Sequence, residues 1–208
     1  MHNSVAAVNL GSSMNDDLKD QTDESLMLRY STGDAAAFEV LYSRHKGPLF
    51  RYFRRQCSEA AIAEELFQDS WMSIIKARKK YISSAKFTTY MYTVAHNKLI
   101  DYYRRNKIRF SDSVSNDDCE TEDIIEALPA SKQQQPEHIL AAEQKRTRLL
   151  SAIELLPEKQ REVFLLREES GLSLDEIARI TNVNAETAKS RLRYAVNSLT
   201  KTIQAGDS

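Results

Sequence analysis

The sequence has little of what interrupts helices, because only 5 Gly and 4 Pro occur among its 208 residues. Folds rich in sheets and tight turns use more of both residue types. The chain also has only two cysteines, Cys57 and Cys119, which lie far apart and outside any CxxC motif. This spacing argues against a zinc site and against a disulfide framework. We expect a mostly helical protein with reduced thiols and no bound metal.

Long hydrophobic runs are also missing. No stretch approaches the roughly 20 consecutive apolar residues that a membrane span needs. The amino-terminal segment MHNSVAAVNLGSS has no Lys or Arg ahead of its short apolar patch, unlike a secretory signal. We therefore expect a cytoplasmic protein without membrane insertion.

Signals of catalysis are scarce as well. The four His residues have no metal-ligand spacing, and neither a Gly-rich phosphate loop nor a nucleophile elbow occurs. His96 beside Asn97 is the one pair worth inspecting, and a surface position on a helix accounts for it. We expect no enzymatic activity, no catalytic residues and no cofactor.

The formal net charge of the chain is −1, so the molecule as a whole does not attract nucleic acid. Any nucleic-acid binding must therefore come from local basic clusters. Residues 98 to 109 carry five Lys or Arg residues against one acidic residue, Asp101. Residues 111 to 126 then carry seven acidic residues and no basic ones.

Helical periodicity begins only after a polar stretch, so we expect residues 1 to 22 to form a disordered tail. Apolar residues then recur at spacings of three and four, which is typical of amphipathic helices. The first two expected helices are separated at Gly33-Asp34, where Asp34 can cap the second. Gly47-Pro48 within that second helix predicts a kink and not a stop.

Two further helices complete the first expected domain, residues 23 to 106. The third begins near Ser58, a good N-cap, and ends at about Arg78. The fourth carries an apolar face made of Phe87, Tyr90, Met91, Val94, Ala95 and Leu99.

The periodicity fades over residues 107 to 136, which are acidic and Gln-rich and predict a flexible linker. A helix restarts at Pro136-Glu137, and Pro157 suits the first turn of the helix that follows. Residues 137 to 204 are thus expected to form a second domain. The expected fold class is all-α, with two small helical domains.

The strongest local motif is SGLSLDEIARITNVNAETAKSRLRYAVNSL, residues 170 to 199, which has the pattern of a helix-turn-helix. Ser173 and Glu176 form a capping box that starts a short helix. The turn falls at Asn182-Val183-Asn184, and Asn184 can cap the next helix. The inward-facing residues are Leu174, Ile177 and Ala178 on the first helix and Ala188, Leu192, Ala195, Val196 and Leu199 on the second.

The outer face of that second helix carries polar and charged side chains in its first two turns, where a recognition helix enters the major groove. These residues are Glu186, Thr187, Lys189, Ser190 and Arg193, and Arg191 flanks them. An ordinary helical hairpin with a solvated charged face is the alternative. The two caps, the small Ala178 at the helix crossing and the length of the unit favour DNA binding.

Three segments precede this motif in a fixed order, namely LMLRYSTGDAAAFEVLYSRH, AEELFQDSWMSIIKA and KFTTYMYTVAHNKLIDYYRR. The order resembles the extracytoplasmic-function (ECF) subfamily of sigma-70 type bacterial RNA polymerase sigma factors. The similarity covers about residues 23 to 105 and 140 to 202. It implies a four-helix sigma region 2 domain followed by a helix-turn-helix sigma region 4 domain. The implied function is to bind core RNA polymerase and direct promoter-specific initiation of transcription.

The resemblance also implies which residues bind the polymerase. In the family, the third helix of the first domain is the main surface for a coiled coil of the polymerase largest subunit. The matching polar positions are Glu64, Glu65, Gln68 and Asp69. An acidic and amide-bearing face suits a basic partner, although a merely solvated face stays open as an alternative for each residue. Phe67 and Trp71 are expected in the core.

The family opens the minus-ten promoter element with its fourth helix and the preceding loop. The resemblance assigns this role to Tyr81, Ser83, Ser84, Lys86, Asn97, Lys98, Arg104 and Arg105. Aromatic and small polar side chains can receive an unstacked base, and the cations of the helix can follow the phosphates. Tyr90-Met91 stands where the family usually has a Trp-containing step, which leaves the detailed map of contacts open. For Tyr90, a core role is at least as probable as a DNA contact.

The resemblance assigns recognition of the minus-thirty-five element to Lys189, Ser190, Arg191 and Arg193. Glu186 either accepts from a cytosine amino group or points away from the DNA. The implied partners are core RNA polymerase, promoter DNA and an anti-sigma factor. The competing hypothesis is a stand-alone helix-turn-helix regulator that binds duplex DNA without polymerase.

Overall fold

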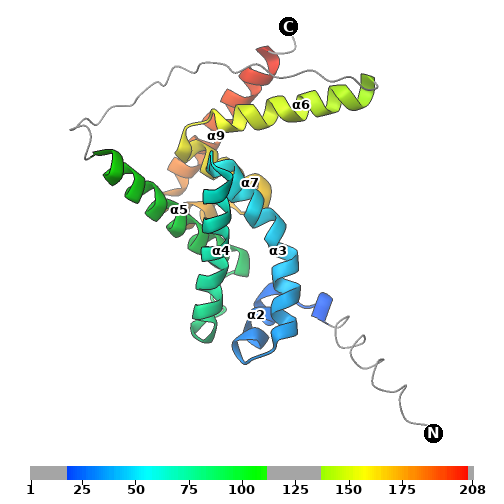
Figure 1. The fold of residues 1–208 in the computed structure, drawn as a ribbon, viewed down its shortest axis with the longest axis vertical. Coiled ribbons are helices and arrows are strands. Elements are labelled where there is room, and N and C mark those ends of the chain that lie inside the picture. The colour runs from blue at the N-terminus through cyan, green and yellow to red at the C-terminus, as the bar shows by residue number, and fades with distance from the viewer. Residues whose placement is uncertain (1–17, 112–136, 206–208) are drawn as a thin grey trace.

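The computed structural model describes residues 18 to 111 and 137 to 205, and every regular element in these ranges is helical (Figure 1). The expected all-α class is therefore confirmed. No helix in the described ranges is long and apolar enough to cross a membrane. In the same ranges, no group of three or more His, Cys, Asp or Glu side chains could hold a metal ion.

The first group of helices contains the four that the sequence predicts. They are α2 (Asp23–Ser31), α3 (Ala35–Gln56), α4 (Ala60–Ala77) and α5 (Phe87–Ser111), with a 3-10 turn, η1 (Arg78–Lys80), after α4. Helix α3 packs against both α2 and α4, and α5 packs against α4 (Figure 1).

The break between α2 and α3 falls at the expected position. Gly33 has a φ angle of 113°, in the left-handed region that favours glycine. Asp34 caps α3, because its Oδ1 atom accepts from the Ala37 backbone N–H at 3.3 Å. Helix α3 then continues through Pro48 without a stop.

The start of α4 corrects one prediction. The sequence favours Ser58 as the N-cap, but Glu59 holds that position and makes no capping bond with its side chain. Serine propensity therefore did not decide where this helix begins.

The predicted disordered tail also needs a correction at its end. Residues 1 to 17 lie outside the described part of the chain, but Leu18 is only 3% exposed and belongs to the core. Arg44 of α3 donates to the backbone oxygen of Gln21 at 2.9 Å. Residues 18 to 22 are thus packed against the first group of helices.

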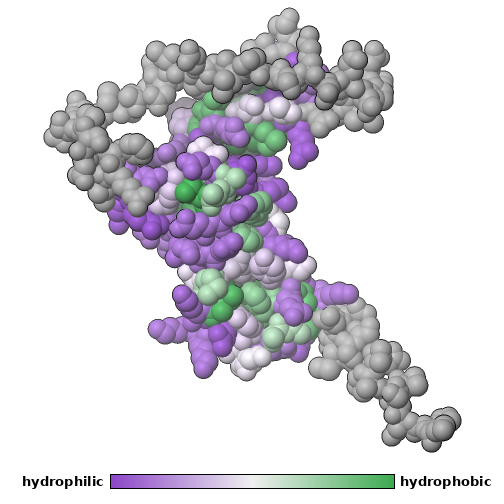
Figure 2. Space-filling model, in the orientation of Figure 1, coloured by the Kyte–Doolittle hydropathy of each residue, from purple (hydrophilic) through white to green (hydrophobic). Residues whose placement is uncertain are grey.

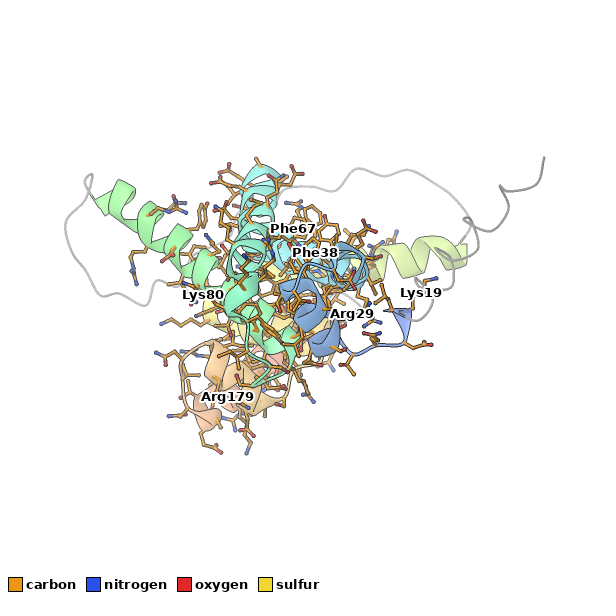
Figure 3. All side chains as sticks on the ribbon, turned by 90° about the horizontal axis from the view of Figure 1, so that it is seen from below. Lys19, Arg29, Phe38, Phe67, Lys80 and Arg179 are labelled. Atoms are coloured by element: carbon orange, nitrogen blue, oxygen red, sulfur yellow. The ribbon has the colours of Figure 1, made fainter. Side chains whose placement is uncertain are left out.

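Aromatic side chains fill the space between α3 and α4. Trp71 is buried and makes edge contacts with Phe38 and Tyr42, at ring-centroid distances of 5.8 and 4.9 Å. Phe67 lies beside Trp71 at 6.5 Å, and Figure 3 labels Phe38 and Phe67 where the two helices meet. The expectation that Trp71 and Phe67 pack in the core is confirmed.

The second group of helices starts where predicted. It contains α6 (Glu137–Glu154), α7 (Glu158–Ser170), α8 (Leu174–Ile180) and α9 (Ala185–Ala205). Pro157 occupies the N-cap of α7. Helix α5 extends to Ser111, beyond the predicted domain limit at residue 106, and the remainder of the predicted linker lies outside the described residues.

The helix-turn-helix has the predicted caps. Ser173 and Glu176 form the capping box of α8, and Asn182, in the turn, has a positive φ of 51°. The Asn184 side chain accepts from the Thr187 backbone N–H at 2.7 Å. One predicted inward residue is wrong, because Val196 is 45% exposed.

The two groups of helices pack against each other. Helix α3 contacts α6 and α7, and α5 contacts α8 (Figure 1). Hydrophilic residues cover most of the face seen in Figure 2, where hydrophobic residues form only small separate patches. The contact between the groups places Lys86, a predicted minus-ten residue, against Glu176 of α8.

Candidate nucleic-acid and polymerase interfaces

The outer face of α9 presents the side chains that the sequence predicts. Glu186, Lys189 and Arg193 are exposed, whereas Thr187 and Ser190 are half-buried. Arg191 is also half-buried, as its position flanking the outer face predicts. Together they form a polar patch that can reach base edges and phosphates in a groove.

Two charged side chains of this face have partners on the same helix. Glu186 Oε1 lies 3.9 Å from Lys189 Nζ, and both side chains are highly exposed. The Arg193 guanidinium lies 5.2 Å from the centre of the Tyr194 ring, which suits a cation–π contact. Glu186 thus has a partner within its own helix.

The loop before α5 presents small polar side chains to solvent. Ser83 and Ser84 are exposed, and Ile82 between Tyr81 and Ser83 is 77% exposed. An exposed apolar side chain of this kind can insert beside an unstacked base. Ile82 was missed by the sequence reasoning, although an apolar residue flanked by serines in a loop was a usable signal.

Tyr81 is only partly available to a base. Its ring packs against Tyr90 and Phe87 at centroid distances of 5.3 and 6.5 Å. Burial raises the pKa of both the Tyr81 and the Tyr90 hydroxyls. Tyr90 is partly buried against the core, and its ring contacts that of Tyr81.

Three basic residues that were not predicted as DNA-binding residues lie directly before Tyr81. The turn η1 contributes Arg78, Lys79 and Lys80, of which the two lysines are exposed. Figure 3 labels Lys80 at this turn. The sequence signal for these residues is the run RKK directly before Tyr81.

Helix α5 carries the predicted phosphate-following residues along one exposed side. Asn97, Arg104 and Arg105 are exposed, and Lys98 Nζ lies 3.7 Å from Asp69 Oδ2 of α4. This ion pair joins the predicted minus-ten residues to the predicted polymerase-binding residues. The two surfaces are therefore neighbours.

The predicted polymerase-binding face of α4 is open to solvent. Glu64, Glu65 and Gln68 are exposed and Asp69 is half-exposed. Their spacing of three and four residues puts them on one side of the helix, opposite the buried Leu66 and the aromatic core. The face is acidic, as a basic partner requires.

Comparison with known families decides what these surfaces belong to. The family model "Sigma-70 region 2" matches residues 41–108, and the model "Sigma-70, region 4" matches residues 146–199.

The chain belongs to the sigma-70 family.

Curated relatives agree with this assignment. The RNA polymerase sigma factor YlaC of Bacillus subtilis is 27% identical over 167 residues, which cover 77% of this chain and 91% of that protein. The ECF RNA polymerase sigma-E factor of Escherichia coli K12 is 27% identical over 187 residues, which cover 88% and 95%. The resemblance found in the sequence is confirmed, and the chain is an ECF-type sigma factor that directs promoter-specific initiation.

Solved structures share the fold. The sigma factor RpoE of Bartonella quintana, in complex with the anti-sigma factor NepR, matches with a TM-score of 0.60 and 22% identity, over 80% of this chain and 96% of that one. CnrH in complex with the cytosolic domain of CnrY matches with a TM-score of 0.62 and 19% identity, over 89% and 99%.

The predicted site residues divide cleanly between the two sigma regions. All polymerase-binding and minus-ten residues fall within region 2, and all minus-thirty-five residues fall within region 4. Sigma factors are regulators, which agrees with the expectation that the chain is not an enzyme.

His96 corrects a prediction, because it is not a simple surface residue of α5. Its side chain is only 12% exposed, and its Nδ1 atom lies 2.6 Å from Glu162 Oε1 on α7. Tyr52 of α3 donates to the same carboxylate oxygen at 2.9 Å. Burial, together with the Glu162 charge, raises the pKa of Tyr52 well above its ordinary value.

Lys86, a predicted minus-ten residue, is also engaged by region 4. Its Nζ atom lies 3.3 Å from Glu176 Oε1, and Thr89 donates to the same oxygen at 3.2 Å. Hydrogen bonds from the backbone and the hydroxyl of Ser173, followed by the Lys86 contact, lower the pKa of Glu176 to about 2. Glu176 therefore caps α8 and contacts Lys86 of the loop before α5 with one ionised carboxylate.

Proposed function

We propose that this sigma factor binds the polymerase through α4, captures the minus-ten strand with the loop before α5 and with α5 itself, and grips the minus-thirty-five duplex with α9. The observation that carries this proposal is the order of the two sigma regions on one chain, each with its predicted polar residues at the surface. The separate surfaces suit separate parts of one initiation complex.

The polymerase contact is assigned to Glu64, Glu65, Gln68 and Asp69. These side chains form an acidic face to which a basic coiled coil of the largest subunit can dock. Charged residues at the rim of a protein interface act mainly on the association rate and on the salt dependence of that rate. The contact is therefore expected to weaken as salt rises.

The minus-ten contact is assigned to the loop and to α5. Ser83, Ser84 and the exposed Ile82 are available to an unstacked base, with Tyr81 behind them. Lys86, Asn97, Lys98, Arg104 and Arg105 are proposed to follow the backbone of the separated strand. A grip of this kind releases counterions and is strongly salt dependent.

The minus-thirty-five contact is assigned to the outer face of α9. Lys189, Ser190, Arg191 and Arg193 are proposed to contact bases and phosphates in the major groove, and Thr187 to contact the backbone beside them. Glu186, paired with Lys189, is proposed to orient that lysine.

We further propose a cytoplasmic location and regulation by an anti-sigma factor. The location follows from the polymerase partner. The two solved relatives described above are bound to an anti-sigma factor, NepR, and to the cytosolic domain of CnrY. The exposed faces of regions 2 and 4 give such a protein two surfaces to cover.

Transcription reconstituted from core RNA polymerase, the purified protein and genomic DNA fragments tests the proposal. We expect transcripts that start at a small set of promoters and that disappear when the protein is left out. An absence of promoter-specific transcripts would defeat the sigma assignment. Tight and specific retention of duplex DNA by the protein alone would instead support the stand-alone regulator.

A further inference from the structure

The loop before α5 depends on a helix cap that it cannot make itself. Helix α5 begins at Phe87, and Lys86 is its N-cap residue, because the Lys86 carbonyl oxygen accepts from the Tyr90 backbone N–H at 3.2 Å. The first backbone N–H groups of a helix have no partner within that helix. A lysine side chain has three donors and no acceptor, so the Lys86 side chain cannot satisfy them.

Glu24 of α2 supplies the missing acceptor. Its Oε1 atom accepts from the Phe87 backbone N–H at 2.7 Å, across 63 positions of the sequence. A carboxylate suits this place, because hydrogen bonds to a charged acceptor are short and strong and a negative charge is favourable at the positive end of the helix dipole. The Phe87 side chain is fully buried, so the bond fixes the point where α5 enters the core.

Asp23, the residue before Glu24, fastens the beginning of α2 to α3. Its Oδ1 atom accepts from Arg44 Nη1 at 2.6 Å, and its Oδ2 atom lies 2.6 Å from His45 Nε2. Burial alone would raise the pKa of Asp23, but the hydrogen bonds and charges of His45 and Arg44 lower it. The centre of the His45 ring lies 5.4 Å from that of Phe87. Glu24 therefore reaches α5 from a fixed support.

Helix α2 holds the other end of the loop as well, since it contacts both η1 and α5. The Arg78 guanidinium of η1 lies 5.5 Å from the centre of the Tyr30 ring of α2, which suits a cation–π contact. The Tyr81 backbone N–H then donates to the Arg78 carbonyl oxygen at 3.2 Å. The exposed residues 82 to 85 lie between these two attachments to α2, so α2 determines where they are presented.

The bond of Glu24 also lies close to the ring that stands behind those exposed residues. The Tyr81 ring packs against the Phe87 ring at a centroid distance of 6.5 Å. Burial, followed by the charge of Glu24, raises the pKa of the Tyr81 hydroxyl. A shift of the first turn of α5 would therefore move both Tyr81 and the loop.

We propose that Glu24 is a positioning residue for capture of the minus-ten strand. It fixes the first turn of α5, and with it the loop of residues 81 to 86, by accepting the Phe87 backbone N–H. Glu24 acts through α5 and not by contact with DNA. The inference rests on the proposed function, since it concerns the minus-ten surface assigned there.

The sign of the effect separates positioning from electrostatics. Glu24→Ala removes a negative charge beside a surface proposed to bind a polyanion, so the charge alone would strengthen strand binding. Loss of the cap predicts the opposite, a weaker grip on the strand. Glu24→Gln also removes the charge but keeps an oxygen acceptor, so it should bind the strand at least as tightly as the wild type. Glu24→Asp keeps the charge on a side chain shorter by a methylene group and should resemble Glu24→Ala.

Fluorescence anisotropy of a labelled single-stranded oligonucleotide measures strand binding by the complex of core polymerase with each full-length variant. The oligonucleotide carries the non-template minus-ten sequence of a promoter recovered from reconstituted transcription. We expect the dissociation constant to rise about tenfold for Glu24→Ala and Glu24→Asp, within the range of effects of losing a helix cap. Affinities for core polymerase and for a minus-thirty-five duplex should stay within about twofold of the wild type, because other residues make those contacts.

Hydrogen exchange of the free full-length protein tests the bond itself. The Phe87 amide should exchange about tenfold faster in Glu24→Ala and Glu24→Asp than in the wild type, because its opening no longer breaks a hydrogen bond to a carboxylate. Glu24→Gln should keep the protection. Glu39→Ala is the matched control, since it truncates the same type of side chain at an exposed position of α3. It should change neither the exchange of Phe87 nor strand binding.

Strand binding by Glu24→Ala as tight as that of the wild type, or tighter, would overturn the proposal, and so would equal losses in Glu24→Ala and Glu24→Gln. Where Glu24→Ala loses strand, duplex and polymerase binding together, Glu24→Asp decides, and the same general loss there would contradict a positioning role. A wild-type complex that does not bind the minus-ten strand would defeat the proposed function, while the hydrogen-exchange result would stand by itself.

Discussion

Arg191 and Arg193 lie in the first turns of α9, where one is half-buried and the other exposed. We expect Arg191→Glu/Arg193→Glu to reduce binding of the minus-thirty-five duplex by at least about 100-fold, because each good base contact is worth about 1–3 kcal/mol and the new carboxylates repel phosphates. Binding is measured with the polymerase complex on promoter fragments recovered from reconstituted transcription.

The control for this double variant is Lys201→Glu, which changes charge late on the same helix at an exposed position. It should bind the duplex almost as the wild type does. Core polymerase binding should be unchanged in both variants. A simultaneous loss of duplex and polymerase binding would indicate misfolding and would contradict a specific role for the two arginines.

Glu176 gives a second prediction for a single residue, based on its pKa of about 2. The folded-state pKa lies below the ordinary value of 4.5, so the stabilisation is fully present above pH 4.5 and is lost as the pH falls toward 2. Glu176→Gln keeps a side-chain acceptor for the capping box but removes the charge. We expect it to destabilise the protein by about 1 kcal/mol at neutral pH.

The measurement for Glu176→Gln is thermal unfolding of the full chain by circular dichroism at several pH values. The difference from the wild type should shrink as the pH falls from 4.5 toward 2, because the Glu176 side chain of the folded protein loses its charge only near pH 2. Asp175→Asn, a neighbouring exposed residue in the same turn, serves as the control. A difference in stability that stays constant down to the lowest pH measured would show that the charge of Glu176 does not contribute to the stability of the protein.

At the scale of the element, α4 presents an acidic face whose charge can be tested without touching the core. We expect Glu65→Lys to weaken core polymerase binding about tenfold at low salt and less at high salt, because rim charges act through screened attraction. Glu39→Lys makes the same change at an exposed position of α3. Equal losses in both variants would contradict a docking surface on α4.

Local sequence signals predicted the helices well where short-range bonds decide them. The break at Gly33-Asp34 and the capping box of α8 involve residues only three or four positions apart, so propensity and spacing were sufficient. Ser58 was predicted as the N-cap of α4, but the helix begins one residue later, with Glu59 at that position. Val196 failed because helical spacing alone gives the direction of a side chain but not whether another helix covers it.

Contacts between distant elements could not be predicted in the same way. His96 and Glu162 are separated by 66 residues, and Arg51 and Glu169 by 118. Their pairing depends on how two groups of helices dock, which periodicity within each group does not encode. The surface assigned to each promoter element came from family resemblance, and the contact of Lys86 with Glu176 of α8 became visible only in three dimensions.

At the scale of the whole molecule, the ion pairs of Glu169 on α7 with Arg51 and Arg55 on α3 make the shape of the free protein depend on salt. We expect the radius of gyration of the wild type to increase between about 0.05 M and about 0.5 M salt, as the Debye length falls from about 14 Å to about 4 Å. Salt can screen the ion pair of Arg51 with Glu169, because the Arg51 side chain is 51% exposed, although that of Glu169 is only 8% exposed. Small-angle scattering across the salt series measures the change.

A Glu169→Arg variant distinguishes weakening of this contact from general swelling. It lacks the ion pairs of Glu169 with Arg51 and Arg55, so its radius of gyration should increase less with salt than that of the wild type. An equal increase in the wild type and in Glu169→Arg would assign the effect to other parts of the chain, because the two proteins differ only in these pairs.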